Sequence, residues 1–558
     1  VTAVSICQLR LWIELLKNAY YDNGVMETLP NIDINIKTGN SLTYYAKFEV
    51  GESIIKSNKN SSEVDSSDLA SLREYRNSVK EYKSCSDKFK KKQIIAKIKQ
   101  IKDNLFYNDA QQHLEDKKDS ANKFDNAIEW AIEFPEVIDE NGKFTGFDIV
   151  IGNPPYIQLQ KMNNGADALA KMNYATYVRS GDIYCLFYEL AYKLLKKNGM
   201  LAYISSNKWM RAGYGEALRN FLVTKTDPVQ LIDFSGEKVF QKVTVDVNIL
   251  IYRKAENQFN TLSCIIKGSD WRNNLSDYVR QHAVSNRFDS SGSWVILSPV
   301  EQSIKRKIES IGTPLKDWNI KIYRGILTGY NEAFIIDRKK KDELISADPK
   351  SAEIIRPILR GRDIKRYGFD FADQYIIATF PSKNYNIDDY PAVKEYLLSF
   401  GIERLEQSGK QYTINGEIVK SRKKTNNKWF ETQDSISYWD DFSKQKILWG
   451  EISDIPKFML DNSKDFCISN KAFLLTGNNL PELLLFLNSS LCQYYFSTIA
   501  TTTGEGTVQW LKYKVELIPV PQFNQNISRM LISLEKAVDE RGLTKDLDNK
   551  IDDLIYSL

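Results

Sequence analysis

Apolar residues recur at two different spacings in the first half of the chain, and together they predict alternating helices and strands. Spacings of three and four residues predict amphipathic helices over residues 4–16 and 182–196. Short apolar runs predict buried strands. These runs occur at 34–38, 147–151, 200–204, 230–234 and 245–252. We expect the first to end in a Gly-Asn turn and the last to lie in a hairpin or at an edge of the sheet.

A highly charged segment, about 55–125, interrupts this alternation. Apolar residues recur at helical spacing over 69–79 and again over 94–105. Ser84–Asp87 lies between them and is expected to form a turn. We therefore predict a helical hairpin inserted into an α/β domain. Its lysines at 88–92 are interpreted as a solvated helix face rather than a nucleic-acid contact.

The order of the predicted elements indicates two domains. Strands that alternate with helices predict a mostly parallel sheet covered by helices on both faces. Beyond residue 267 the alternation loosens, and a polar stretch at Asp289–Gly292 marks the expected boundary. The expected fold class is α/β: a Rossmann-like sheet with a helical insertion over 1–298, followed by a mixed α+β domain over 299–558 with a C-terminal helical tail.

The most informative stretch follows the strand at 147–151 and reads Gly-Asn-Pro-Pro-Tyr, residues 152–156. Its two prolines lack N–H donors and fix their φ angles, so the chain leaves the sheet as a stiff, extended loop. That loop presents the amide of Asn153, carbonyl oxygens without local N–H partners, and the ring of Tyr156. A flat ring with an exocyclic amine, such as a nucleobase, would find acceptors and a stacking surface there.

This motif after a hydrophobic strand resembles the catalytic loop of the N6-adenine DNA methyltransferases. The resemblance implies that the Asn153 side chain and the Pro154 carbonyl accept hydrogen bonds from the adenine amine. It also implies that Tyr156 stacks on a base flipped out of the duplex. The amine nitrogen would then attack the methyl group of S-adenosylmethionine. Residues 153–156, Pro155 included, are the expected catalytic site; an edge strand closed by a proline turn is the alternative.

Two further residues take roles from the same resemblance. Asn40 follows Gly39 at the place where the family contacts the adenine ring of the cofactor, so Asn40 and Asn153 are the expected cofactor-binding residues. Ligands of such sheets bind beyond the carboxyl ends of the strands, where both could share one cleft. Phe240 is the expected second wall of the base pocket. An ordinary Asn turn and a core Phe are the alternatives.

The carboxy-terminal half carries five strings that resemble, in the same order, the target-recognition domain of type IIG restriction–modification enzymes. They are 324–334, 356–364, 469–473, 487–490 and 503–507. Arg324, Arg360 and Arg362 each lie next to a glycine, and we expect them to contact DNA phosphates or guanine edges. The alternative is that they form turns and ion pairs that hold a loop-rich domain together.

Composition narrows the classes of site and the compartment. A net charge of only +4 means that any nucleic-acid surface is a local patch. Six cysteines without a CxxC pair argue against a zinc site or a disulfide scaffold and favour the cytoplasm. Two histidines argue against a His-based triad or a His-rich metal site, so no metal is expected. We see no signal peptide and no apolar run that would span a membrane.

The sequence departs from the resembled family at its start. Methyltransferases with this gamma-type motif order carry a glycine-rich loop and an acidic residue for the cofactor ribose, and neither is found here. The first residue is Val1. We therefore expect a fragment of a longer protein, inactive alone and impaired in binding S-adenosylmethionine. A nuclease domain upstream in the same polypeptide is a further expectation, with double-stranded DNA as the partner.

Two other readings stay open. A protein-glutamine methyltransferase uses a similar Asn-Pro-Pro-Tyr loop, although a protein substrate needs no large domain punctuated by Arg and Gly. A non-catalytic DNA-specificity module of a larger assembly is the second. Endonuclease activity within this chain is disfavoured, because no convincing acidic nuclease signature occurs in it.

Overall fold

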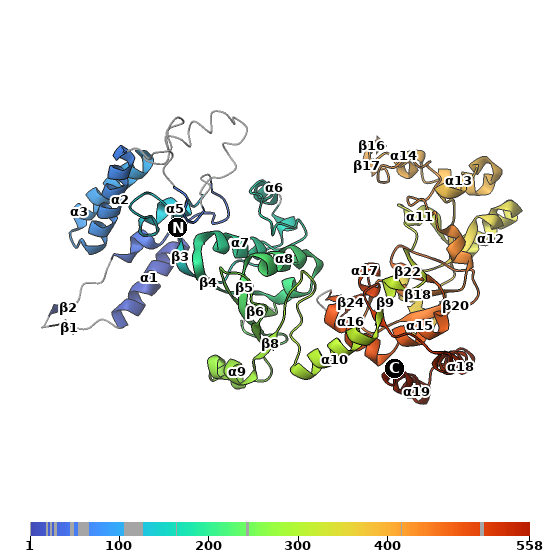
Figure 1. The fold of residues 1–558 in the computed structure, drawn as a ribbon. Coiled ribbons are helices and arrows are strands. Elements are labelled where there is room, and N and C mark those ends of the chain that lie inside the picture. Colours follow the sequence, from blue (N-terminus) through green and yellow to red (C-terminus); the bar gives the residue numbers. More distant parts are fainter. Residues whose placement is uncertain are drawn as a thin grey trace. The chain divides into compact units, whose positions relative to one another are not determined.

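The computed structural model describes two compact units, Val1–Ile296 and Leu297–Leu558, close to the expected boundary (Figure 1). The described residues are 2–17, 21–22, 25–26, 31–44, 49–53, 66–104, 127–162, 164–240, 245–414, 416–502 and 507–558. We call the two units the first and the second domain.

The first domain is built on a six-stranded sheet in the order β3-β4-β6-β5-β7-β8. Its strands are β3 (Phe147–Gly152), β4 (Leu195–Ser206), β5 (Asp227–Asp233), β6 (Val247–Arg253), β7 (Thr261–Ile265) and β8 (Val284–Asn286). β3 pairs parallel with β4, and β5 pairs parallel with β7, whereas β6 is antiparallel to both β4 and β5. β3, β4, β5 and β7 therefore share one direction, which confirms the mostly parallel sheet.

β3 forms one edge of the sheet, and its Ile149 and Ile151 are 65% and 80% exposed, so the prediction that residues 147–151 form a buried strand was wrong. Within the described residues only β4 pairs with it.

β6 lies inside the sheet and pairs antiparallel with the preceding strand β5, so the hairpin alternative is confirmed and the edge alternative was wrong. Val247, Leu250 and Tyr252 of this strand are fully buried. Leu250 and Tyr252 pack in one apolar cluster, and Val247 packs in another. A strand that is apolar on both faces is expected inside a sheet that is covered on both sides.

The described part of the first domain also contains α-helices. They are α1 (Thr2–Lys17), α2 (Ser66–Ser84), α3 (Lys88–Lys102), α5 (Trp130–Glu133), α6 (Asn164–Ala170), α7 (Tyr184–Leu194), α8 (Glu216–Lys225) and α9 (Leu275–His282). α7 and α8 bury Tyr184, Tyr188 and Leu218 against Leu201 and Leu250 of the sheet. α7 ends at Leu194, two residues before the end of the predicted helix, because β4 begins at the next residue.

The charged insertion is a helical hairpin, as expected. α2 and α3 bury Leu72, Tyr75 and Ile98 in a cluster of their own. The side chain of Asp87 accepts a hydrogen bond from the backbone N–H of Lys90 at 2.6 Å and so caps α3. The expected helical positions beyond residue 104 lie outside the described residues.

The predicted strand at 34–38 was wrong. Ile32–Asn35 form a short 3-10 helix, and residues 36–38 have no regular structure. A strand needs a neighbouring strand to receive its hydrogen bonds. In the described part of the chain, only an isolated bridge between Asn40 and Ala127 supplies such pairing here. The expected Gly-Asn turn is present, with Gly39 at a φ of 159°.

The second domain combines helices with two four-stranded sheets, which confirms the mixed α+β class. One sheet has the order β10-β22-β18-β20 and the other β11-β15-β12-β21. Their strands are β10 (Ile320–Arg324), β11 (Ile335–Asp337), β12 (Ile355–Leu359), β15 (Gln374–Ile377), β18 (Lys446–Gly450), β20 (Phe458–Asp461), β21 (Cys467–Ile468) and β22 (Ala472–Gly477). The longer helices are α10 (Pro299–Ile311), α12 (Arg338–Ala347), α13 (Pro391–Leu398), α15 (Leu480–Leu487) and α16 (Ser490–Ile499).

The C-terminal helices α18 (Gln525–Arg541) and α19 (Lys545–Tyr556) are present, but they are not merely solvated. They bury Leu531, Val538 and Ile551 in the core cluster that also contains α15 and β22. Apolar residues at helical spacing give each helix one face that packs on this core.

Arg422 ties together several loops of the second domain. Its guanidinium donates hydrogen bonds of 2.6–2.8 Å to four carbonyl oxygens, those of Thr328, Leu405, Trp429 and Glu431. Burial lowers the pKa of Arg422 to about 10, against the opposing effect of Glu431. The side chain is therefore a charged, buried brace that donates to all four carbonyls; that of Glu431 also accepts a hydrogen bond from Gln407 at 3.1 Å.

We expect Arg422→Met to destabilise the protein by about 3 kcal/mol, because four carbonyl oxygens lose a donor. The thermal unfolding midpoint measures this. The neighbouring Lys423 is exposed, so Lys423→Met is the matched control and should stay within about 0.5 kcal/mol of wild type. Equal midpoints for the two variants would refute the bracing role.

Candidate catalytic loop and nucleic-acid interface

The loop that follows β3 is fixed at both ends. At its start, Gly152 pairs with Tyr203 of β4. At its far end, the backbone N–H of Leu159 donates to Gly181 at 2.9 Å, and that of Ile183 donates to Ile157 at 2.9 Å. Residues 153–156 therefore lie between the sheet and the start of α7, with little freedom to move.

Asn153 and Tyr156 form a hydrogen-bonded pair within this loop. The Tyr156 hydroxyl donates to Asn153 Oδ1 at 2.8 Å. Asn153 is exposed, and an amide oxygen has two lone pairs, so one remains for a ligand. Pro154 is buried, and no group of the described residues donates a hydrogen bond to its carbonyl oxygen. Pro155 is exposed.

The ring of Tyr156 is held from the side. It meets the Tyr184 ring edge to face, with centroids 6.1 Å apart and an interplanar angle of 84°. Tyr184 and Tyr214 share a hydrogen bond of 2.8 Å, and the Tyr214 hydroxyl donates to Asp182 at 3.1 Å. Burial raises the pKa of Tyr156 to about 12 and also raises the pKa of Asp182.

Sequence reasoning missed this support. Its signal was the string Gly181-Asp182-Ile183-Tyr184, which places an acid and an aromatic residue at the start of a predicted helix. Only the fold shows that the string lies beside the catalytic loop, because their separation along the chain gives no distance.

Phe240 and Tyr156 pack on the same apolar cluster. Both are partly buried against a group that includes Ile232, Phe234 and Val247. The structure thus brings the two expected aromatic walls to one side of the sheet. Residues 241–244, which follow Phe240, lie outside the described residues.

A second polar group, not anticipated from the sequence, lies at the same edge of the sheet. The Asn207 amide, after β4, donates to Asp233 at the end of β5 at 2.8 Å, and the Ser235 hydroxyl donates to the other carboxylate oxygen at 2.8 Å. Burial raises the pKa of Asp233, against these hydrogen bonds. Because β3, β4 and β5 run in one direction, these residues lie at the edge that carries Asn153.

Asn40 makes a local turn. Its side-chain oxygen accepts a hydrogen bond from the backbone N–H of Leu42 at 3.1 Å, and the residue is exposed. Leu42 is buried in a cluster with Leu159 and Ile183, which border the catalytic loop. The cofactor role of Asn40 stays a prediction.

The three candidate DNA-contacting arginines differ in their environment. Arg360 binds Asp363 through two guanidinium nitrogens, at 2.9 and 2.8 Å, and this hydrogen bonding raises the pKa of Arg360. Arg324 lies 3.3 Å from a carboxylate oxygen of Glu451, which Lys471 also approaches at 3.3 Å. Arg362 is exposed, and none of the ion pairs of the described residues involves it.

The glycines beside these arginines serve the fold itself. A Cβ atom at Gly325 would lie 2.1 Å from the Ser469 carbonyl oxygen, and one at Gly361 would lie 2.4 Å from that of Lys471. The absence of a side chain lets these backbones cross. The expectation that glycine serves close approach to DNA is not needed to explain either position.

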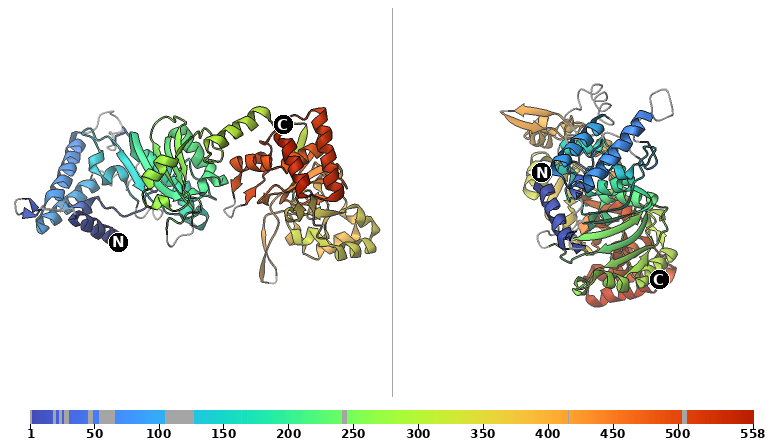
Figure 2. Two further views of the ribbon diagram at one scale, coloured as in Figure 1. Left: turned by 90° about the horizontal axis from the view of Figure 1, so that it is seen from below. Right: turned by 90° about the vertical axis from the view of Figure 1, so that its left-hand side faces the viewer.

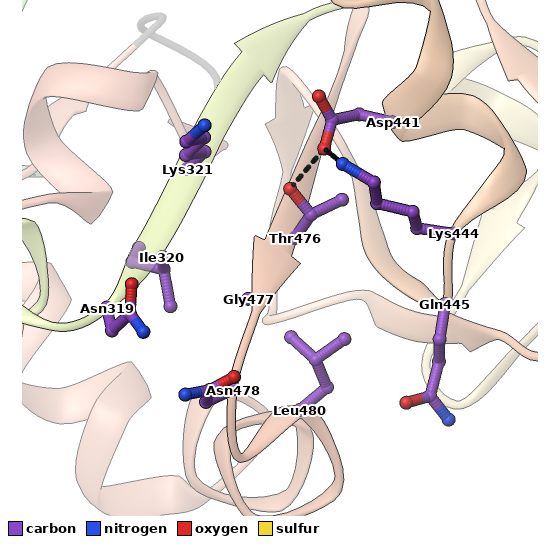
Figure 3. A pocket seen from close by; sticks show the side chains of 10 residues that line it. All are labelled: Asn319, Ile320, Lys321, Asp441, Lys444, Gln445, Thr476, Gly477, Asn478 and Leu480. Atoms are coloured by element: carbon purple, nitrogen blue, oxygen red, sulfur yellow. Dashed lines mark hydrogen bonds and ion pairs between the residues drawn. The ribbon is translucent and has the colours of Figure 1, made fainter.

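The second domain also holds a polar pocket of about 330 Å³ (Figure 3). Lys444 and Thr476 both reach the buried carboxylate of Asp441, each at 2.9 Å. The pocket is lined by Asn319, Ile320, Lys321, Asp441, Lys444, Gln445, Thr476, Gly477, Asn478 and Leu480. The ion pair and the hydrogen bond account for the carboxylate within the fold.

Across the described ranges, no helix combines the length and the apolar character needed to cross a membrane. The same residues hold no group of three or more His, Cys, Asp or Glu side chains placed to bind a metal ion.

Two family models match the chain. The Eco57I restriction-modification methylase model matches residues 1–240, and the TaqI-like C-terminal specificity domain model matches residues 356–520. These matches confirm the resemblance inferred from the catalytic loop and from the strings of the second half.

Curated relatives agree. The type II methyltransferase M.BstVI of Geobacillus stearothermophilus is 22% identical over 400 residues, which are 67% of each chain. M.XhoI of Xanthomonas vasicola is 23% identical over 425 residues, 72% of each chain. The restriction enzyme and methyltransferase RM.Eco57I of Escherichia coli is 23% identical over 391 residues, which are 64% of this chain but 38% of the relative.

Solved structures include the type IIL restriction-modification enzyme MmeI in complex with DNA (TM-score 0.46, 13% identity, 73% of this chain) and the type IIG restriction endonuclease BpuSI (TM-score 0.31, 13% identity, 76% of this chain). This chain spans 54% of the length of the first and 57% of the second. Its sequence nonetheless matches both family models in the expected order: the chain joins an Eco57I-like restriction-modification methylase domain to a TaqI-like C-terminal specificity domain.

Proposed function

We propose that this chain is the methylase and specificity portion of a restriction–modification enzyme. In this proposal it transfers a methyl group from S-adenosylmethionine to the N6 amine of an adenine flipped out of a specific DNA sequence. The observation that carries the proposal is the ordered Asn153–Tyr156 pair, which presents an exposed amide oxygen directly after β3, an edge strand of the sheet.

The chemistry follows from the acceptors of the loop. Asn153 Oδ1 and the Pro154 carbonyl accept the two N–H groups of the amine, which raises the electron density on its nitrogen. The Tyr156 hydroxyl, like that of an ordinary tyrosine, is protonated at neutral pH and donates to Asn153; burial raises its pKa further, to about 12. That bond fixes the amide so that its oxygen, rather than its NH₂ group, faces the amine.

The oxygen acceptors of the loop also suit the cofactor. S-adenosylmethionine supplies an electrophilic methyl group on a positively charged sulfur. The loop offers neutral oxygen dipoles, which tolerate this charge without the strong ground-state stabilisation that a carboxylate would add. Tyr156 and Phe240 line the site that receives the base, and the exposed Asn40 is the proposed contact to the cofactor adenine.

The second domain supplies recognition of double-stranded DNA. Of the three arginines, Arg362 is best placed for a phosphate or a base edge, because its side chain is exposed and unpaired within the described residues. RM.Eco57I is by its name both a restriction enzyme and a methyltransferase, and MmeI was solved with DNA. We propose that this chain likewise serves restriction and modification of DNA in the cytoplasm. A nuclease domain upstream in the same polypeptide would cleave the DNA.

Asn153→Ala should lower methyl transfer by at least about 100-fold in the full-length polypeptide, because the amine loses a main acceptor. Transfer of a tritiated methyl group from S-adenosylmethionine to duplex DNA measures this, with DNA affinity expected to stay unchanged. The exposed Asn220 on α8 provides the control Asn220→Ala. An Asn153→Ala variant that keeps most of its rate would sink the assignment.

Tyr156→Ala and Tyr156→Phe separate stacking from hydrogen bonding. The alanine variant should lose about 1–3 kcal/mol of base stacking. With 2-aminopurine at the target, it should lose the fluorescence of the flipped base. The phenylalanine variant should keep that fluorescence but transfer the methyl group more slowly, since Asn153 is no longer oriented. Equal fluorescence in both variants contradicts the stacking role.

Arg360→Gln and Arg362→Gln should have opposite consequences. Loss of the Arg360–Asp363 pair should cost about 1–3 kcal/mol of stability with little change in DNA affinity. Arg362→Gln should weaken DNA binding and leave the stability within about 0.5 kcal/mol of wild type. Urea unfolding and DNA titration measure the two effects. The reverse pattern would show that Arg360, not Arg362, reads DNA.

A further inference from the structure

A two-stranded ribbon stands out from the second domain, and neither the catalytic loop nor the candidate arginines account for it. β16 (Gln411–Ile414) and β17 (Glu417–Lys420) pair only with each other. The register joins Gln411 to Lys420 and Thr413 to Ile418. Figure 2 shows the ribbon projecting away from the rest of this domain.

The two faces of the ribbon differ. Directly opposed residues of an antiparallel pair lie on one face. The outer face therefore carries Gln411, Thr413, Ile418 and Lys420, all of which are exposed, and Ile418 is 75% exposed. The other face carries the half-buried Tyr412 and Val419.

The base of the ribbon is rigid. The Ser408 and Ser421 hydroxyls share a hydrogen bond of 2.9 Å, and the Tyr412 hydroxyl donates to Glu406. Directly after the ribbon, Arg422 is anchored by four carbonyl oxygens. These contacts anchor the base of the ribbon to the domain and so hold its outer face in a fixed position.

Positive charge is concentrated on this segment. Residues 406–428 contain six Lys or Arg and two Asp or Glu, and six minus two gives +4, equal to the net charge of the whole chain. Arg422 is buried, so five lysines remain: Lys410, Lys420, Lys423, Lys424 and Lys428. These five are exposed, and none of them takes part in an ion pair of the described residues.

A hairpin that is merely solvated is the simpler explanation of the exposed lysines. The insertion helices α2 and α3 show the charge pattern of such a solvated surface. There Lys90 pairs with Glu81 and Lys97 pairs with Glu74, so the charges alternate. The ribbon instead joins unpaired cations to an exposed isoleucine. An apolar side chain at the end of an uncovered ribbon favours association unless it has a partner. A polyanion with an apolar or aromatic interior matches both features.

We propose that the β16–β17 ribbon enters the major groove of duplex DNA. That groove is wide enough for a two-stranded ribbon and displays thymine methyl groups beside donors and acceptors. Lys420, Lys423 and Lys424 bind phosphates, Gln411 and Thr413 face base edges, and Ile418 contacts the apolar part of a base. This inference rests on the proposed DNA-reading function and names the segment that performs it.

The first test uses the charge. The triple variant Lys420→Gln, Lys423→Gln, Lys424→Gln should bind a mixed-sequence DNA duplex more weakly. Each phosphate contact contributes about 0.9 to the slope of log affinity against log salt, so the slope should fall by about 2 to 3. The matched control replaces the exposed Lys88, Lys92 and Lys99 of α3 by Gln, removes the same charge, and should leave the slope unchanged.

The second test uses position. A photoreactive benzoylphenylalanine at Ile418 should form an adduct with the duplex on irradiation. The same residue at Phe89 of α3, which is 72% exposed, should form none. Both sites are exposed, so neither substitution threatens folding. Equal adducts at the two sites, or none at Ile418 while wild type binds the duplex, would overturn the ribbon assignment.

These experiments keep the two proposals apart. If wild-type protein binds no duplex at any salt concentration, the DNA-reading function fails. If wild type binds and the triple lysine variant binds equally well with an equal salt slope, the function stands and the ribbon proposal fails. Preferential binding of the ribbon to anionic phospholipid vesicles rather than to the duplex also overturns it.

Discussion

The hydrogen bond from Tyr156 to Asn153 is the constraint on which the proposed chemistry depends. An amide group exposes an oxygen and an NH₂ group that differ little in shape, and only the oxygen can accept the proton of an amine. A phenol that donates to that oxygen selects the orientation of the amide. The phenol is protonated at neutral pH and can donate there, and burial raises its pKa further, to about 12. The edge of Tyr184 and the anchoring of residues 157–159 then hold the phenol in place.

The loop could be read from the sequence because its information is local. Two adjacent prolines after an apolar run dictate a stiff exit from a sheet wherever they occur. The partners of the loop could not be read in the same way. Asp182 and Tyr214 reach it through long-range packing, and Asp233 joins Asn207 across β4 and β5, which are not neighbours in the sheet. The strand expected at 34–38 failed because of missing long-range information. Apolar alternation was present there, but the neighbouring strand that it requires was not.

The second domain shows how far residue type alone can mislead. An arginine beside a glycine suggested a DNA contact at Arg360, yet the neighbouring Asp363 engages its guanidinium twice. Gly361 is required by the carbonyl of Lys471, which lies too close to admit a Cβ atom. The terminal helices were expected only as a helical tail, yet their amphipathic spacing lets each bury a face on the core. In each case the deciding partner is distant in sequence.

The distribution of charge differs between the catalytic loop and the proposed DNA-binding ribbon. A chain with a net charge of +4 cannot attract DNA as a whole, so attraction has to come from segments where cations outnumber anions. Some cations of the described residues are paired nearby, as Arg360 is with Asp363 and Lys90 is with Glu81. The catalytic loop adds no charge at all, which suits a site that must accept a neutral amine and a cationic cofactor together. In our proposal, affinity for the phosphate backbone comes from the unpaired lysines at residues 410–428, so the catalytic loop does not have to supply it.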